Sequence, residues 1–164
     1  MILFTVGTHE QPMSRYVPVL ADIARQLPER GPFVAQHGAT ALPTGWIGSQ
    51  EVARGEMARL LAEAVVVITH GGPATIAEAR AAGRLPIVVP RRAGFGEHVD
   101  DHQVAYARRL AAAGEILLVE DAANLLPMVR DYEQVSAALP PPRAHDSGPA
   151  VAAFASVVGR LISR

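Results

Sequence analysis

The chain has 164 residues, of which 49% are hydrophobic and 5% aromatic, and its formal net charge is −1. This length suits one domain with a single buried core, and the near-neutral charge offers no attraction for nucleic acid or an anionic membrane. The absence of cysteine excludes disulfides, thiolate zinc sites and a cysteine nucleophile. No apolar run approaches the roughly 20 residues of a transmembrane helix, and the first six residues do not resemble a signal peptide. We therefore expect a cytoplasmic protein.

Apolar runs and helical periodicities alternate along most of the chain. Short apolar runs predict strands over residues 2–6, 33–37, 45–48, 65–68, 85–89 and 116–119. The spacing of apolar residues predicts helices over residues 14–27, 56–64, 74–82, 98–113 and 122–138. Strands that alternate with helices indicate an α/β fold with a Rossmann-like, doubly wound parallel sheet.

Prolines separate the end of the chain from this pattern. We expect one α/β domain over residues 1–139, a proline-rich linker over residues 140–149 and an amphipathic helix over residues 150–164. The apolar face of that helix carries Phe154, Val157, Val158 and Leu161. A partner or the chain's own sheet must cover this face, so the helix is a candidate docking element.

The segment from Val65 to Glu78 joins a buried strand to a helix through a Thr-His-Gly-Gly turn at residues 69–72. Pro73 suits the first helical position, where an amide has no partner anyway. The free amides and the dipole of such a helix start favour phosphate. Thr75 and Glu78 share one helix face, which places a hydroxyl near the phosphate and a carboxylate near a ribose. The pattern predicts a nucleotide diphosphate site, although glycine turns also follow strands in other α/β proteins.

Three polar loops follow predicted strands, at residues 7–11, 70–72 and 91–103. Ligands of doubly wound sheets bind at the carboxyl ends of the strands, so we expect these loops to form one site. The segment over residues 91–96 contains two arginines and two glycines and has the composition of a mobile loop.

Three segments carry a family resemblance: Val-Gly-Thr-His-Glu-Gln-Pro at 6–12, His70-Gly71-Gly72 with Glu78, and Gly-Glu-His-Val-Asp-Asp-His-Gln at 96–103. In this order they resemble the nucleotide-sugar half of the two-domain (GT-B) glycosyltransferases, of the family 28 C-terminal-domain type. The resemblance covers about residues 1–120. Within that type the chain looks like the free-standing subunit of a split enzyme that acts on lipid-linked sugars. Such subunits include bacterial exopolysaccharide glucuronosyltransferase subunits and the small subunit of the eukaryotic lipid-linked GlcNAc transferase.

The resemblance implies roles at matching positions. His70 would approach the diphosphate and Glu78 would bind the uridine ribose, since the interval between them is eight residues (78 − 70) in this chain as in relatives. Gly71, Gly72 and Thr75 would complete the phosphate site. Ala74 stands where some relatives carry asparagine, so one side-chain contact is missing here.

The same resemblance assigns the sugar and the cleft. The residues matched to positions that hold sugar hydroxyls are Asp100, His102 and Gln103. Gly7 and Thr8 match the glycine loop on the acceptor side of the cleft. Asp101, where relatives often have asparagine, receives no role.

A general base for the acceptor hydroxyl has two candidates on this chain. His9 and Glu10 follow the first predicted strand, and either side chain suits this chemistry. In whole enzymes of this type the base usually comes from the other domain, and that alternative stays open. Arg91 and Arg92 are positioned in sequence to reach a diphosphate or a uronic-acid carboxylate, or else are solvated loop charges.

Two of the histidines also suggest a metal site. His98 and His102 lie four residues apart, and on a helix such a pair can share a metal ion. In the other interpretation His98 caps the helix and His102 alone faces the sugar. No third ligand is evident in the sequence, and transferases of the resembled fold work without a metal in the site. We therefore expect no metal and no cofactor.

The resemblance implies an inverting transferase half that binds a UDP-sugar, with glucuronate favoured over GlcNAc. It also implies a membrane-anchored subunit that presents a polyprenyl-diphosphate-linked acceptor, so this chain would lie at the inner face of the membrane through its partner. The alternatives are a nucleotide-sugar-binding module without transfer activity and a metal-dependent hydrolase that uses His98 and His102. A homodimeric epimerase is disfavoured, because the second domain of such enzymes is missing.

Overall fold

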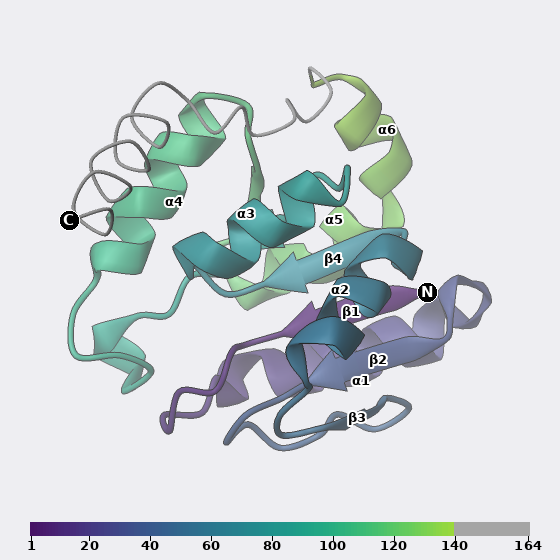
Figure 1. The fold of residues 1–164 in the computed structure, drawn as a ribbon, viewed down its shortest axis with the longest axis horizontal. Coiled ribbons are helices and arrows are strands. Elements are labelled where there is room, and N and C mark those ends of the chain that lie inside the picture. The colour runs from purple at the N-terminus through teal and green to yellow at the C-terminus, as the bar shows by residue number, and fades with distance from the viewer. Residues whose placement is uncertain (140–164) are drawn as a thin grey trace, which may run out of the picture.

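The computed structural model describes residues 1–139, which form one parallel six-stranded sheet between two layers of helices (Figure 1). The strands are β1 (Ile2–Thr5), β2 (Phe33–Gln36), β3 (Ile47–Ser49), β4 (Val66–Thr69), β5 (Ile87–Val88) and β6 (Leu117–Leu118). Their order in the sheet is β3-β2-β1-β4-β5-β6, and every neighbouring pair is parallel. The predicted doubly wound Rossmann-like sheet is confirmed.

The helices divide between the two faces of this sheet. They are α1 (Val17–Gln26), α2 (Arg54–Glu63), α3 (Pro73–Ala81), α4 (His102–Ala112), α5 (Leu125–Arg130) and α6 (Tyr132–Ala137), with short 3-10 helices η1 (Ser14–Tyr16), η2 (Pro28–Arg30), η3 (Ala93–Phe95) and η4 (Ala122–Asn124). Buried side chains of α1, α5 and α6 pack on one face, whereas those of α2, α3 and α4 pack on the other.

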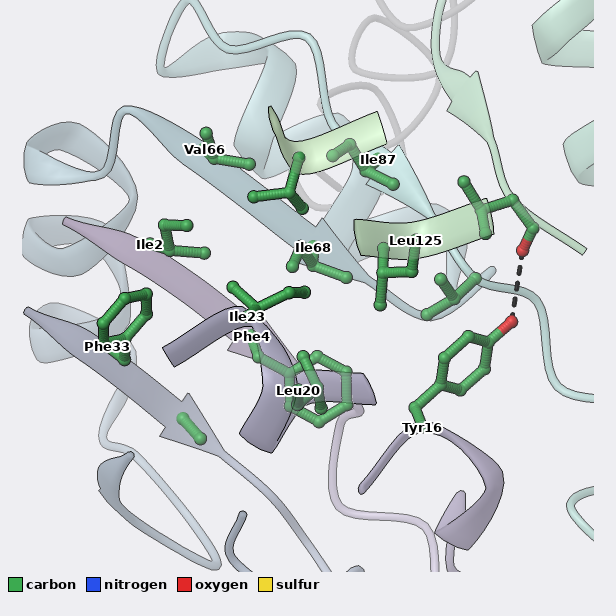
Figure 2. Close-up of a cluster of buried hydrophobic side chains, with 14 of the residues drawn as sticks. Ile2, Phe4, Tyr16, Leu20, Ile23, Phe33, Val66, Ile68, Ile87 and Leu125 are labelled. Carbon is green, nitrogen blue, oxygen red and sulfur yellow. Dashed lines mark hydrogen bonds between the residues drawn. The ribbon is translucent and has the colours of Figure 1, made fainter. Parts of the chain in front are cut away.

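The larger core layer lies between the sheet and α1, α5 and α6. Figure 2 shows Ile2, Phe4 and Ile68 of the central strands facing Leu20 and Ile23 of α1. At the edge of this layer the Tyr16 hydroxyl donates a hydrogen bond of 3.1 Å to the carbonyl of Val119. This bond joins η1, which directly precedes α1, to the chain just beyond β6.

The strands at the centre of the sheet are buried throughout because both of their faces are covered. All four residues of β1 and of β4 are buried, as expected for a parallel sheet with helices on both sides. Trp46 belongs to the same core. It is buried, and its indole N–H donates to the carbonyl of Leu20 at 2.7 Å.

Two predicted helices differ from the structure because side chains redirect the backbone. The helix predicted over 98–113 begins only at His102, where the amide donates to the Asp100 carboxylate at 3.1 Å. His98 is therefore not on the helix and does not cap it. The helix predicted over 122–138 is three shorter ones, and the carbonyl of Arg130 at the last break accepts from Arg30.

The ends of the other elements follow the sequence closely. Asp121 caps η4, since its carboxylate accepts from the amide of Ala123 at 3.0 Å. The linker predicted over 140–149 and the helix predicted over 150–164 lie outside the described residues. Within residues 1–139, no helix is both long enough and apolar enough to span a bilayer.

Candidate functional site

The strand order reverses between β1 and β4, which is where doubly wound sheets form a ligand crevice. The chain moves outward in one direction from β1 through β2 to β3, and in the other from β4 through β5 to β6. Ligands of doubly wound sheets bind at such a reversal, beyond the carboxyl ends of the strands. The loop after β1 and the turn after β4 meet here, because the amide of His70 donates to the carbonyl of Thr5 at 3.1 Å.

The His-Gly-Gly turn after β4 is packed so closely that both glycines are needed. A Cβ atom on Gly72 would lie 2.4 Å from Nε2 of His70, and one on Gly71 would lie 2.8 Å from Cβ of Gln103. Gly7 presses on the same imidazole from the β1 loop, since its Cβ would lie 3.0 Å from Cε1 of His70. The imidazole of His70 is therefore held between two backbones at the mouth of the crevice.

The environment of His70 keeps its imidazole neutral. Burial lowers the pKa of His70 to about 4, and the nearby positive charge of Arg91 adds to the effect. Its Nδ1 atom is buried and has no hydrogen-bond partner within residues 1–139. Near neutral pH this side chain can contribute one N–H donor to a ligand, but no positive charge.

The start of α3 presents amides that no helical carbonyl uses. Pro73 occupies the first turn, and the amides of Ala74 and Thr75 precede the first possible intrahelical bond. The amide of Gly71 is different, because it donates to Oε1 of Gln103 at 3.1 Å. An anion at this helix start would therefore meet the amides beyond Gly71 rather than that of Gly71 itself.

A groove of about 410 Å³ runs between α2 and α3, and Glu78 is exposed on it. The lining residues are Arg54, Ala58, Leu61, Ala62, Glu78, Ala81 and Ala82. Thr75, one turn before Glu78, is half-buried near the start of the helix. The two side chains thus follow the order that the sequence predicts, with the hydroxyl near the turn and the carboxylate deeper along the helix.

Arg91 is not where its sequence position suggests. It is 1% exposed, and its guanidinium donates to the carbonyls of Val6 at 2.7 Å, Glu97 at 3.1 Å and Gln11. The alternative of a solvated loop charge is therefore wrong, and three backbone carbonyls already engage the guanidinium. The side chain instead ties the loop after β1 to the loop after β5.

Glu97 is a part of the site that the sequence analysis missed. It is 1% exposed, and its carboxylate accepts from Arg15 at 2.8 and 3.1 Å and from the amide of Arg92 at 3.1 Å. Arg92 in turn pairs with Glu120 at 2.8 Å. A carboxylate is rarely buried to this degree unless it is paired. These bonds hold the segment over 91–97 in place, so it is a fastened loop and not the mobile one that its glycines suggest. No periodic pattern in the sequence marks Glu97.

Gln103 joins two of the segments that form the site. It is buried, and its Oε1 accepts from the amides of Gly71 and Arg91, both at 3.1 Å. A glutamine keeps two N–H donors on its other side-chain atom. The oxygen is therefore used in joining the turn after β4 to the loop after β5, and only the amide nitrogen is left for a sugar.

Three histidines line up at the rim of the crevice. The ring centroids of His9 and His98 are 5.0 Å apart, and those of His98 and His102 are 4.7 Å apart. Asp100 lies between the last two, with Oδ1 3.8 Å from Nδ1 of His98 and in hydrogen-bond contact with Nδ1 of His102. The loops after β1 and β5 therefore meet through these rings.

The remaining predicted residues lie on the loop after β1. Gly7 has a positive φ of 68° and turns the chain out of the sheet. Thr8 and Glu10 are exposed, whereas His9 is half-buried against His98. The structure thus brings the predicted residues of all three loops to one end of the sheet.

A protein-family model matches residues 1–138, and its description is "Glycosyltransferase family 28 C-terminal domain". The chain belongs to this family. Among curated proteins none matches it. The family assignment agrees with the resemblance seen in the three loop motifs, and it covers nearly all of the described residues.

Solved structures share the fold of this family 28 domain. A glycosyltransferase of kitacinnamycin matches with a TM-score of 0.60 and 23% identity, over 97% of this chain and 38% of that one. The glycosyltransferase SnogD from Streptomyces nogalater matches with a TM-score of 0.52 and 21% identity, over 96% of this chain and 42% of that one. The chain thus spans about two fifths of the length of these glycosyltransferases.

Proposed function

We propose that this family 28 domain is the donor-binding, catalytic half of an inverting glycosyltransferase. It binds a UDP-sugar and transfers a hexose derivative, glucuronate or GlcNAc, to a polyprenyl-diphosphate-linked acceptor. The observation that carries the proposal is the order of groups along one element: the His-Gly-Gly turn, then the free amides at the start of α3, then Glu78, which lines the groove between α2 and α3.

The nucleotide fits this path in one direction. Its diphosphate lies at the turn, where the helix dipole and the amides of Gly72, Ala74 and Thr75 favour negative charge. His70 adds a neutral donor, and the exposed carboxylate of Glu78 accepts both ribose hydroxyls. A groove of about 410 Å³ lies in the range of small-molecule sites.

The sugar lies on the other side of the diphosphate, toward the loop after β5. Asp100 and His102 are both exposed there, and with the amide nitrogen of Gln103 they hold the sugar hydroxyls. Transfer leaves UDP with additional negative charge. Because the amides at the start of α3 already point at the phosphates, they stabilise this charge without reorganisation.

The acceptor side requires more than this domain. We propose that a membrane-associated subunit binds the lipid-linked acceptor and closes the crevice over Gly7 and Thr8. His9, or Glu10 beside it, is the candidate base on this chain, since the half-buried His9 lies at the end of β1 where an acceptor hydroxyl would enter. Through its partner the chain would work at the inner face of the membrane.

The test of the nucleotide site is calorimetric titration of UDP into the purified protein in the presence of EDTA. Glu78→Gln keeps the shape of the side chain but removes the ionised acceptor, so we expect UDP affinity to fall about 5- to 150-fold, which corresponds to about 1–3 kcal/mol. Glu63→Gln, on the exposed end of α2, is the matched control and should bind UDP as the wild type does. Equal affinity of both variants would contradict the proposal.

A transfer assay distinguishes a glycosyltransferase from a module that only binds the nucleotide sugar. With membranes that contain the partner, radiolabelled UDP-glucuronate or UDP-GlcNAc should label a lipid product, and Glu78→Gln should reduce the labelling. Tight UDP binding without any labelled lipid would favour the non-catalytic module.

A further inference from the structure

The loop between β5 and α4 exposes carboxylates, while the arginines around it are engaged elsewhere. We propose that the donor sugar is uncharged, a neutral hexose or N-acetylhexosamine, and that the carboxylate of Asp100 excludes a uronic acid from the site. The proposal rests on the function proposed above, which places the sugar against Asp100 and His102. It narrows the two donors named there to UDP-GlcNAc.

The carboxylate of Asp100 is ionised and reaches solvent. Its side chain is 60% exposed, and Oδ1 accepts from the amide of His102 at 3.1 Å and contacts Nδ1 of the same residue. These two bonds, the one from the amide first, lower the pKa of Asp100. The neighbouring Asp101 is exposed as well. The loop therefore carries negative charge at neutral pH.

The two imidazoles of the loop do not offset this charge. Burial of His98, together with the neighbouring rings of His102 and His9, lowers the pKa of His98, so this ring is neutral near pH 7. His102 turns Nδ1 to Asp100. A proton on that nitrogen therefore lies against the carboxylate of the protein and not against that of a ligand.

An arginine is the remaining partner for a uronic acid, because the chain contains no lysine. Guanidinium groups bind carboxylates through paired N–H donors. Three arginines of this region already use these donors. Arg15 bonds both oxygens of Glu97, at 2.8 and 3.1 Å. Arg92 and Arg108 both bond Glu120, at 2.8 and 2.7 Å. Each of these cations thus has its counter-charge within the protein.

The other arginines of the loop and of α4 are Arg91 and Arg109. Arg91 is 1% exposed, backbone carbonyls engage its guanidinium, and its Nε is buried too. Arg109 lies in the last turn of α4, seven residues (109 − 102) after His102, which is about 10 Å along the helix axis. The loop over 7–13 and the turn at 70–72 contain no arginine. Among the described residues, none of these segments places an arginine where it could pair with an acidic sugar.

The same groups suit a neutral sugar. An ionised carboxylate accepts hydrogen bonds from hydroxyls, and the amide nitrogen of Gln103 donates to a hydroxyl oxygen. A uronate would instead bring a second negative charge to Asp100 without a counter-charge. Such repulsion rejects one ligand while it leaves the attractive contacts of the other in place.

The experiment compares two donors that differ in one group. UDP-glucose carries a hydroxymethyl group where UDP-glucuronate carries a carboxylate, so the ratio of their dissociation constants isolates the charge. In calorimetric titrations with EDTA present, the wild type should bind UDP-glucuronate about tenfold more weakly than UDP-glucose. Asp100→Asn and Asp100→Ser should each bring the two constants within about threefold of each other. Asp22→Asn, which removes a carboxylate from α1, is the matched control and should keep the wild-type ratio.

A structural defect at Asp100 would weaken both donors alike and leave their ratio unchanged, so the ratio separates exclusion from misfolding. The proposal is overturned if a wild type that binds UDP binds UDP-glucuronate as tightly as UDP-glucose. It is also overturned if the discrimination persists in both Asp100 variants. Absence of any UDP binding would contradict the nucleotide site of the proposed function, and this inference with it.

Discussion

At the scale of single residues, the site depends on a neutral imidazole packed between backbones. His70 has Gly7 on one side and Gly72 on the other, and neither position has room for a methyl group. Burial excludes the water that would solvate an imidazolium, so the folded protein disfavours protonation at this residue. A donor with no charge suits a phosphate that must leave again after transfer.

This burial predicts a loss of stability in acid. The pKa of His70 falls from 6.5 to about 4 on folding, so below pH 6.5 the unfolded chain takes up a proton that the folded one does not. The contribution is absent above pH 6.5 and grows to about 3 kcal/mol of lost stability as pH falls to 4. Urea denaturation of wild type and His70→Gln between pH 7.5 and 4 measures it.

Comparing how steeply the free energy of unfolding falls with pH in the two proteins separates the contribution of His70 from that of the other titrating groups. The wild type should lose more stability than His70→Gln over the same range, whatever their difference at pH 7.5. Parallel pH profiles for the two proteins would show that His70 titrates normally.

At the scale of elements, buried ion pairs fasten the loops that form the crevice. Arg15 of η1 donates to Glu97, and also to the carbonyls of Pro90 and Glu120. Arg91 joins the same loop to the carbonyls after β1. The loops after β1, β5 and β6 are therefore held as one unit.

Removing the central carboxylate should loosen this unit. Glu97→Gln leaves the guanidinium of Arg15, 15% exposed in its side chain, without its counter-charge, so we expect about 3–5 kcal/mol of destabilisation. Glu56→Gln breaks an exposed pair with Arg59 on α2 and should leave the free energy of unfolding nearly unchanged. Chemical denaturation measures both, and similar stabilities would refute a fastening role for Glu97.

The segments around these loops are also the part of the fold that apolar periodicity does not predict. Apart from β3, whose three residues are exposed, the strands and the helices α1, α2 and α3 follow from apolar periodicity, because each buries one face or two. The start of α4 and the break before α6 do not. At the first, Asp100 accepts a hydrogen bond from the amide of His102, and at the second, Arg30 donates one to the carbonyl of Arg130. Periodicity carries no record of such side-chain contacts.

The same distinction holds for the site. Strand ends predict which loops meet, and the turn at 70–72 with Glu78 is found where the motif requires. The sequence misplaces Arg91 and overlooks Glu97, because a charged side chain in a glycine-rich segment reads as solvated. Burial of both arises only when three distant loops pack together.

At the scale of the whole molecule, the domain supplies one wall of a crevice. The strand order of its sheet reverses between β1 and β4 (Figure 1). Glu78 of α3, the helix that follows β4, lines the groove between α2 and α3. The chain spans about two fifths of the solved glycosyltransferases that share its fold. We propose that a partner supplies the acceptor half, while residues 1–139 carry the donor site.

The most direct test of this account is a crystal structure of the protein with UDP. We expect the diphosphate at the start of α3, within hydrogen-bond distance of the amides of Gly72 and Thr75, and both ribose hydroxyls on the carboxylate of Glu78. Density for UDP at any other place, with the start of α3 vacant, would contradict the central claim that this end of the sheet is the donor site.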